Sequence, residues 1–119
     1  MPLPLVASGN YMTDKVVVLT TAGNEAEARK LAQGLVERRL AACVNIVPRI
    51  QSIYRWEDKV ESSEEFLLFI KTTKGRASEV QAAIRELHSY ELPECIVLSI
   101  EGGSEKYLKW IEESVRRLT

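Results

Sequence analysis

The chain is poor in the residues that most often build metal and redox sites. It contains one histidine, His88, and two cysteines, Cys43 and Cys95, and no CxxC or CxxH spacing occurs. Closed tetrahedral zinc sites and dithiol redox motifs depend on such spacings. Both cysteines lie in apolar, strand-like segments, where a thiol without a cationic neighbour behaves as a small, inert hydrophobic residue. The sequence therefore offers no zinc or redox motif within one chain.

Net charge and long apolar runs are also scarce. Lysine and arginine number 16 and aspartate and glutamate 17, which leaves a net charge of −1 over 119 residues. A protein of this balance has no general attraction to phosphate backbones or anionic membranes. No window approaches a transmembrane span, and the N-terminal segment lacks the basic region and apolar core of a secretory signal. We expect a cytoplasmic protein without membrane insertion, with a loose tail at 1–13 and one domain at 14–119.

A catalytic constellation is equally hard to find. Nucleophilic catalysis needs a nucleophile, a base and an orienting group within hydrogen-bond reach. The sequence suggests no such pair, which counts against a small hydrolase. Gly102-Gly103 follows a strand-like run but lacks the rest of any phosphate-loop fingerprint. We therefore expect no enzymatic activity and no organic cofactor.

What the chain does contain is one long pair of strand-forming segments. Residues 43–56 and 59–72 are rich in β-branched and aromatic side chains and are joined by an acidic pair at 57–58. Each arm has 14 residues, so at ~3.3 Å per residue it spans roughly 46 Å, against a diameter of roughly 35 Å for a compact domain of this length. The tip, with Tyr54 and Trp56, would face water beyond its own domain. The hairpin length thus predicts packing on another copy of the chain.

Two polar features mark this hairpin. Pro48 cannot donate a hydrogen bond to a strand ladder, so it predicts a bulge or a bare edge in the first arm. The acidic residues at 57–61, Glu64 and Glu65 are interpreted as a solvated tip and rim. An acidic patch that attracts cations is the alternative interpretation.

The other segments alternate between helical and strand periodicity. Asn24 with Glu27 forms one capping pattern, and Ser78 with Gln81 forms a second after Gly75. The order βαββαβ followed by α predicts an α+β, ferredoxin-like fold with an extended hairpin between its second and third strands. The elements expected are a strand at 15–21, a helix to about 39, the two hairpin arms, a helix ending by 90 and a strand at 95–100. A last helix follows Ser104, with its apolar stripe at Leu108, Ile111, Val115 and Leu118.

RNA-recognition modules share this strand order, but they carry aromatic residues on the middle strands and a basic face. Those strands here carry Val, Ile, Asn and Leu, and the charge balance is slightly acidic. We expect no nucleic-acid partner.

His88 is a candidate metal ligand with two open interpretations. It lies four residues after Ile84 at the end of the second helix, where a histidine also complements the helix dipole. It is either a partly buried helix-end residue with one backbone partner, or a metal ligand. A metal site would need symmetric copies of the chain, carboxylates, or one of the thiols Cys43 and Cys95 to complete it.

Four motifs, in this order and spacing, are ERRLAACVNIVP, SIYRWEDKV, FLLFIKTT and LHSYELPECIVL. They closely resemble the CutA divalent-cation tolerance proteins over about residues 15–117. The resemblance implies a ferredoxin-like protomer, a tight homotrimer similar to the signalling P-II proteins, and a cytoplasmic role tied to copper and other divalent metals. It brings no accepted enzymatic activity.

The resemblance also implies site residues. Some members are said to hold metal through a cysteine near the end of the first strand and a histidine pair closing the second helix. The corresponding positions here are Thr20 and Leu87-His88, so His88 is the matching ligand. Cys43 lies within a family motif and is the second candidate metal residue. The motif residues best placed for a subunit cleft or interface are Tyr54, Trp56, Lys71, Tyr90 and Glu91.

The leading functional hypothesis is therefore a homotrimer that binds divalent cations, copper foremost, without catalysis. The alternative is a P-II-like signalling or scaffold module that binds a small ligand or a protein partner in clefts between subunits. Titration with Cu²⁺ and Zn²⁺, against a His88→Ala variant, would separate the two.

Overall fold

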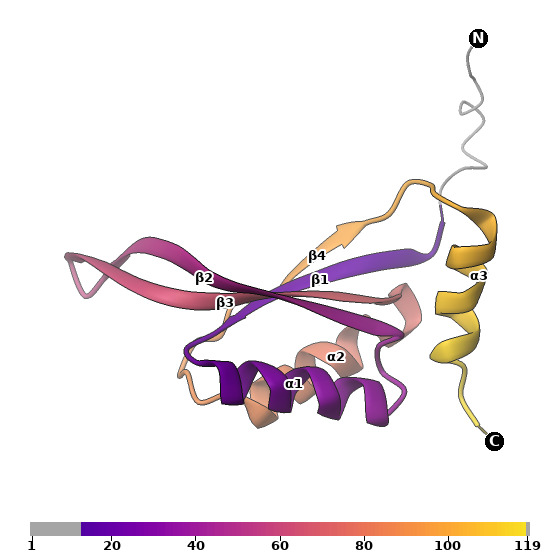
Figure 1. Ribbon diagram of the computed structural model, residues 1–119, viewed down its shortest axis with the longest axis horizontal. Helices are drawn as coiled ribbons and strands as arrows, with labels where there is room; N and C mark the ends of the chain where they lie inside the picture. The colour runs from indigo at the N-terminus through magenta and orange to yellow at the C-terminus, as the bar shows by residue number, and fades with distance from the viewer. Residues whose placement is uncertain (1–12, 119) are drawn as a thin grey trace, which may run out of the picture.

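The computed structural model describes residues 13–118, and its elements follow the order expected from the sequence (Figure 1). They are β1 (Lys15–Ala22), α1 (Glu25–Glu37), β2 (Cys43–Trp56), β3 (Lys59–Thr73), α2 (Lys74–Leu87), β4 (Ile96–Ser99) and α3 (Glu105–Ser114). The strands form one antiparallel sheet in the order β2-β3-β1-β4. This arrangement confirms the ferredoxin-like fold. The expected tail lies outside the described residues except for Thr13, whose hydroxyl donates to the Ile100 carbonyl at 2.5 Å.

The core lies between one face of the sheet and the helices α1 and α2, which run side by side beneath it in Figure 1. Alternate residues of β1, such as Val16 and Val18, point into this core and are at most 1% exposed. Successive side chains of a strand face opposite sides of a sheet. The intervening residues Val17 and Leu19 are accordingly only partly buried. One face of the sheet is thus covered by helices, and the other is largely open.

The sequence correctly predicts two of the helix starts. The Asn24 side chain accepts a hydrogen bond from the Glu27 backbone N–H at 2.8 Å and caps α1. The Ser104 hydroxyl accepts from the Tyr107 N–H at 3.3 Å and caps α3. In each case the side-chain oxygen satisfies a donor that has no partner within the helix. No helix in the described part of the chain is long and apolar enough to cross a membrane.

The predicted start of α2 is wrong by about one turn. The sequence places the cap at Ser78, beyond Gly75, whereas the helix begins at Lys74 with extended Thr73 as its N-cap residue. Strand β3 passes directly into the helix, and the Lys74 N–H donates to the Asp14 carbonyl at 2.7 Å. The Asp14 carbonyl, just before β1, therefore accepts from a backbone N–H at the helix start, as a capping side chain would.

The hairpin is as long as the sequence predicts. The β2–β3 pairing runs from Cys43 opposite Lys71 to Trp56 opposite Lys59, and the longest dimension of the molecule is 48 Å. Figure 1 shows the hairpin extending well beyond the two helices. The two turn residues at 57–58 have φ values of 51° and 66°, as a tight two-residue hairpin turn requires. The ladder shifts register between Val47 and Ile50, which confirms the bulge expected at Pro48.

Strand β4 and the end of the chain expose apolar side chains. In β4, Ile96, Val97 and Leu98 are 46–48% exposed, although the strand pairs with β1 along one edge. The predicted stripe on the last helix holds for Ile111 and Val115, which are buried. It fails for Leu118, because α3 ends at Ser114 and Leu118 is 78% exposed.

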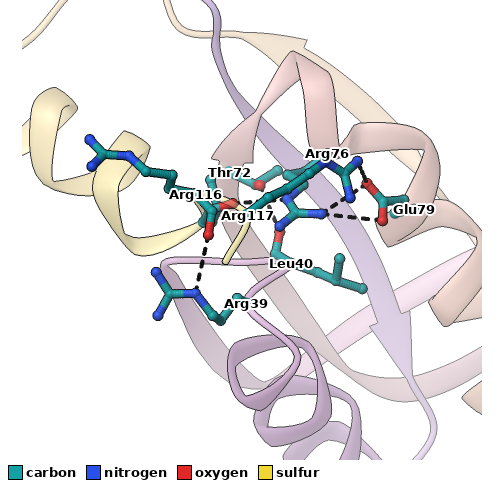
Figure 2. Close-up of polar contacts among 8 residues, drawn as sticks. Arg39, Leu40, Thr72, Arg76, Glu79, Arg116 and Arg117 are labelled. Carbon is teal, nitrogen blue, oxygen red and sulfur yellow. Dashed lines mark hydrogen bonds and ion pairs between the residues drawn. The ribbon is translucent and has the colours of Figure 1, made fainter. Parts of the chain in front are cut away.

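The end of α3 is attached to the domain by arginines from other elements (Figure 2). The buried Arg76 side chain donates from Nε to the Val115 carbonyl at 2.9 Å. Arg39 donates to the carbonyl oxygens of Glu113 and Arg116 at 3.1 and 3.2 Å. These bonds satisfy the carbonyl groups that the last turn of any helix leaves without partners.

Candidate functional site

A hollow lies between the hairpin and the segment that connects α2 to β4. It is a cavity of about 600 Å³, a size typical of small-molecule sites. Its lining comprises Thr21 at the end of β1, Ser52, Ile53, Tyr54, Trp56 and Glu65 from the hairpin, and Tyr90, Glu91, Leu92 and Glu94 from the connecting segment.

The structure brings four of the five predicted cleft residues to this cavity. Tyr54 and Trp56 come from β2, and Tyr90 and Glu91 from the segment after α2. Lys71 does not line it. Its ammonium group donates to the side-chain oxygen of Asn45 near the start of β2, toward the other end of the sheet.

Glu65 and Tyr90 form a partly buried polar contact at the cavity. The Tyr90 hydroxyl donates to Glu65 Oε2 at 2.8 Å, and Glu65 is only 8% exposed. Burial raises the pKa of Tyr90, and the hydrogen bond to Glu65 raises it further, so the phenol remains protonated. The interpretation of Glu65 as part of a solvated rim is therefore wrong. The segment at 90–94 covers it, and no local pattern in the hairpin sequence reveals that contact.

His88 connects the end of β1 to the segment after α2. Its Nε2 atom lies 2.5 Å from the Thr21 carbonyl oxygen, and the Tyr90 backbone N–H donates to its Nδ1 atom at 3.0 Å. Since Nδ1 accepts, Nε2 carries the proton and donates to Thr21. Both ring nitrogens are thus used in hydrogen bonds, and the ring packs on Tyr90 with a centroid distance of 4.5 Å.

Glu27 fixes the same region from the first turn of α1. Its Oε2 atom accepts from the Ser89 N–H at 2.7 Å, and its Oε1 atom from the Gly23 N–H at 3.4 Å. The same Oε2 lies 3.7 Å from His88 Nδ1. Burial alone would raise the pKa of Glu27, but the hydrogen bonds from Ser89 and Gly23 hold it below its ordinary value. The sequence identifies Glu27 as a capping residue but gives no sign that it reaches Ser89.

The structure does not bring Cys43 to His88. Cys43 opens β2 opposite Lys71, which in turn pairs with Val17 of β1, whereas His88 contacts Thr21 near the far end of that strand. Burial raises the pKa of the Cys95 thiol. Within residues 13–118, no group of three or more His, Cys, Asp or Glu side chains is arranged to hold a metal ion.

Comparison with known proteins agrees with this architecture and its motifs. The family model for the CutA1 divalent ion tolerance protein matches residues 16–114. The chain belongs to the CutA1 family. It is 46% identical over 101 residues to the chloroplastic CutA protein of Arabidopsis thaliana, covering 85% of this chain and 56% of that one. It is also 46% identical over 98 residues to the divalent-cation tolerance protein CutA of Thermus thermophilus, covering 82% of this chain and 95% of that one.

Solved CutA1 structures share the fold over nearly their whole length. The structure from Thermus thermophilus matches with a TM-score of 0.84 at 44% identity, covering 86% of this chain and 99% of the other. CutA1 from Oryza sativa matches with a TM-score of 0.86 at 39% identity, covering 92% of this chain and 100% of the other. This chain thus spans about half of the Arabidopsis protein but almost all of the bacterial one.

Proposed function

We propose that this CutA1 family member works as a homotrimer that binds divalent cations and thereby contributes to cation tolerance, without catalysing a reaction. The support for assembly is the apolar surface that one chain leaves in water. Ile53 and Val60 at the hairpin tip are 71% and 68% exposed, and the outer edge of β4 has no strand partner among the described residues. Exposed apolar patches and open strand edges are typical of interaction surfaces.

A hairpin tip that packs on the β4 edge of the next copy makes a contact between two different surfaces. Contacts of that kind close into a ring when the rotation between copies allows it. Three copies would bury all three tips and all three β4 edges, and each cavity would then lie at a boundary between subunits. Aromatic cavity residues on the hairpin, such as Trp56, would contribute to that boundary.

The support for cation binding is the charge of the cavity. Among residues 13–118, its lining includes the carboxylates Glu65, Glu91 and Glu94 and no lysine or arginine. Copper is the cation we propose to test first, because Cu²⁺ binds nitrogen and oxygen sites more tightly than the other first-row divalent ions. His88 would join such a site by releasing its bond to Thr21 or to Tyr90, and Cys43 would need a second subunit.

Calorimetric titration of the purified protein with Cu²⁺ and Zn²⁺ tests this proposal. Glu65→Gln removes a buried carboxylate of the cavity, and we expect it to weaken binding roughly tenfold, as loss of a charged hydrogen bond or ion contact does. Glu64→Gln is the matched control, since Glu64 is exposed beside Glu65 and does not line the cavity. Equal affinities for the two variants would place the cation elsewhere. His88→Ala then shows whether the imidazole takes part.

The volume of the cavity favours a second candidate function. A hollow of about 600 Å³ with aromatic walls has the dimensions of a small-molecule site. The second candidate is therefore a P-II-like module whose clefts between subunits bind a small ligand. Ligand binding by metal-free protein, with no response to Cu²⁺, would favour this candidate over the first.

A further inference from the structure

A second cavity, of about 230 Å³, lies between the start of α2 and α3, at the end of β3 that is far from the hairpin tip. Its lining includes Thr73, Gly75 and Arg76 from the junction of β3 and α2, and Glu112 and Val115 from α3. It shares no lining residue with the cavity at the hairpin. A ligand of this second cavity is therefore independent of the cation binding proposed above.

Helix α2 begins at this cavity without a side-chain cap. The first four N–H groups of a helix have no acceptor within the helix. The Asp14 carbonyl accepts from the Lys74 N–H, and no side chain of the described residues caps the helix. The space beside Gly75 is open, since the nearest side-chain atom to a Cβ placed there, Thr73 Oγ1, is 3.9 Å away. The start of a helix carries partial positive charge, so its free N–H groups favour an anion.

The Thr73 hydroxyl is an independent sign of a ligand. Thr73 is 8% exposed, and its hydroxyl has no hydrogen-bond partner among residues 13–118, although buried hydroxyl groups normally have one. The preceding Thr72 points to the helix-covered face, where its hydroxyl donates to the Leu40 carbonyl at 2.6 Å. Side chains alternate along a strand, so Thr73 points to the other face, beside Lys15, which lies opposite it in the register. Helix α3 covers that face here, because Lys15 donates to Glu112 at 3.1 Å. The unpaired hydroxyl therefore points toward the cavity that Thr73 and Glu112 line.

Arginines supply positive charge at the same place (Figure 2). Arg76 lines the cavity and is 7% exposed, and its bonds to Glu79 and to the Val115 carbonyl fix its guanidinium group. Arg117, which also lines the cavity, donates to the same Oε1 atom of Glu79 at 2.6 Å. Two guanidinium groups thus share one carboxylate, and the pair keeps a net positive charge.

Two carboxylates of the lining oppose an anion. Asp14 and Glu112 line the cavity, and the Lys15 ammonium group donates to both, at 2.5 and 3.1 Å. With the ion-pair partners included, the basic side chains are Lys15, Arg76, Arg116 and Arg117, and the acidic ones are Asp14, Glu79 and Glu112. The balance is therefore slightly positive, and the specific contacts must come from the hydroxyl and the N–H groups.

We propose that this cavity binds a phosphate-type oxyanion, either the free ion or the phosphate group of a small monoester. One oxygen of the anion accepts from the Thr73 hydroxyl, and another accepts from the N–H groups at Gly75 and Arg76. The guanidinium groups of Arg76 and Arg117 balance its charge. A tetrahedral oxyanion offers several acceptors to these donors at once. The volume of the cavity suits such a small ion, because sites for larger ligands measure about 300 Å³ or more.

Titration of the ¹⁵N-labelled, full-length protein with inorganic phosphate, followed by NMR at constant ionic strength, tests the proposal. We expect saturable shifts of the Gly75 and Arg76 amide signals, the same signals to move with sulfate, and no such shift with chloride. Glycerol 3-phosphate is the second organic probe of the site. Tighter binding than that of inorganic phosphate would assign the site to a monoester and weaker binding to the free ion, and either result supports an oxyanion site.

Two pairs of variants locate the contacts. Thr73→Val removes the hydroxyl but loses no hydrogen bond of the fold, so stability without phosphate should not fall, whereas phosphate binding should weaken about tenfold. Thr73→Ser, which keeps a hydroxyl, should restore binding. Arg117→Gln removes one exposed charge of the cavity and should weaken binding about threefold. Arg38→Gln is its matched control, because Arg38 pairs with Glu86 at 3.3 Å and does not line the cavity.

Three outcomes would overturn the proposal. The first is the absence of a saturable shift at Gly75 and Arg76 with phosphate and sulfate. The second is wild-type phosphate affinity in Thr73→Val, which would mean that the hydroxyl does not contact the anion. The third is an equal loss in Arg117→Gln and Arg38→Gln, because it indicates general attraction of anions to surface arginines. A Cu²⁺ titration of the same sample shows separately whether the proposed function stands.

Discussion

The two ends of the sheet differ in whether their charged side chains have partners within the chain. At the α3 end, charged side chains find partners within the chain: Lys15 pairs with Asp14 and Glu112, and Arg76 with Glu79 and the Val115 carbonyl. At the hairpin end, carboxylates line a cavity to which no lysine or arginine of the described residues contributes, beside apolar side chains that face water. The charged side chains at the first end are thus paired within one chain. The second end has the properties of a surface that is completed by another molecule, and the predictions below test this difference.

The largest effect is expected at the hairpin, where Trp56→Ala should weaken assembly. Trp56 is 43% exposed in one chain, and docking on a neighbouring subunit would bury the remainder of its ring. We expect a loss of about 3 kcal/mol per site, in the range of aromatic-to-alanine changes at buried positions. Sedimentation over a dilution series should show dissociation of the variant at concentrations where the wild-type protein stays in the proposed trimer.

Trp110→Ala is the matched control for that experiment. Trp110 lies on α3, at the end where the charged side chains are paired within the chain, and is 44% exposed. It packs against Tyr107 at a centroid distance of 5.4 Å, so its loss should affect local packing and leave assembly unchanged. The comparison would be contradicted if Trp110→Ala dissociated the protein and Trp56→Ala did not.

At the α3 end, the largest effect on stability should come from Arg76→Met. The methionine keeps much of the buried hydrocarbon but leaves the Val115 carbonyl without its donor. The free energy of unfolding should fall by about 2 kcal/mol, the cost of a buried acceptor that loses a charged partner. Chemical denaturation measures this fall. Arg117→Gln is the control, because Arg117 is 63% exposed and shares the partner Glu79, and it should change stability little.

An intermediate effect is expected inside the cavity from Tyr90→Phe. This change removes the hydroxyl that donates to Glu65 and leaves a carboxylate that is 8% exposed without a donor. Stability at neutral pH should fall by about 1–2 kcal/mol. Adding Glu65→Gln should recover part of the loss, because the unpaired charge is then gone. A double-mutant cycle by thermal or chemical denaturation gives the coupling, and additive losses would show that the contact is unimportant.

The difference between the two ends also explains what could be predicted from the sequence. The elements, the bulge at Pro48 and the cap at Asn24 depend on neighbouring residues, and these predictions are confirmed. The resemblance of the motifs to a known family indicated four candidate residues for a cleft or interface, Tyr54, Trp56, Tyr90 and Glu91. The structure places all four at one cavity.

The errors have the opposite origin, since each involves residues far apart in the chain. Glu65 is buried by a segment 25 residues later that carries Tyr90, and α2 starts early because Lys74 binds Asp14 across the sheet. Composition and periodicity describe a residue and its neighbours. They say nothing of which distant segment will cover a given carboxylate or supply an acceptor to a given N–H.

The smallest effect should be the pH dependence contributed by Glu27. The folded protein holds the pKa of this carboxyl below its ordinary value, because the hydrogen bonds from Ser89 and Gly23 outweigh the effect of burial. A group whose pKa is lowered by folding stabilises the protein above its unfolded pKa of about 4.3, and this contribution disappears as the pH falls through the lower, folded value.

Glu27→Gln should therefore lower the free energy of unfolding by about 1 kcal/mol at pH 7. Since a protonated Glu27 resembles glutamine, the difference between variant and wild type should shrink below about pH 4. Glu25→Gln, in the same turn of α1 and paired with exposed Arg29, is the control and should show little effect at any pH. Denaturant unfolding at a series of pH values measures both, and a difference for Glu27→Gln that grows toward acid would mean that the carboxylate is not stabilised by its partners in the folded state.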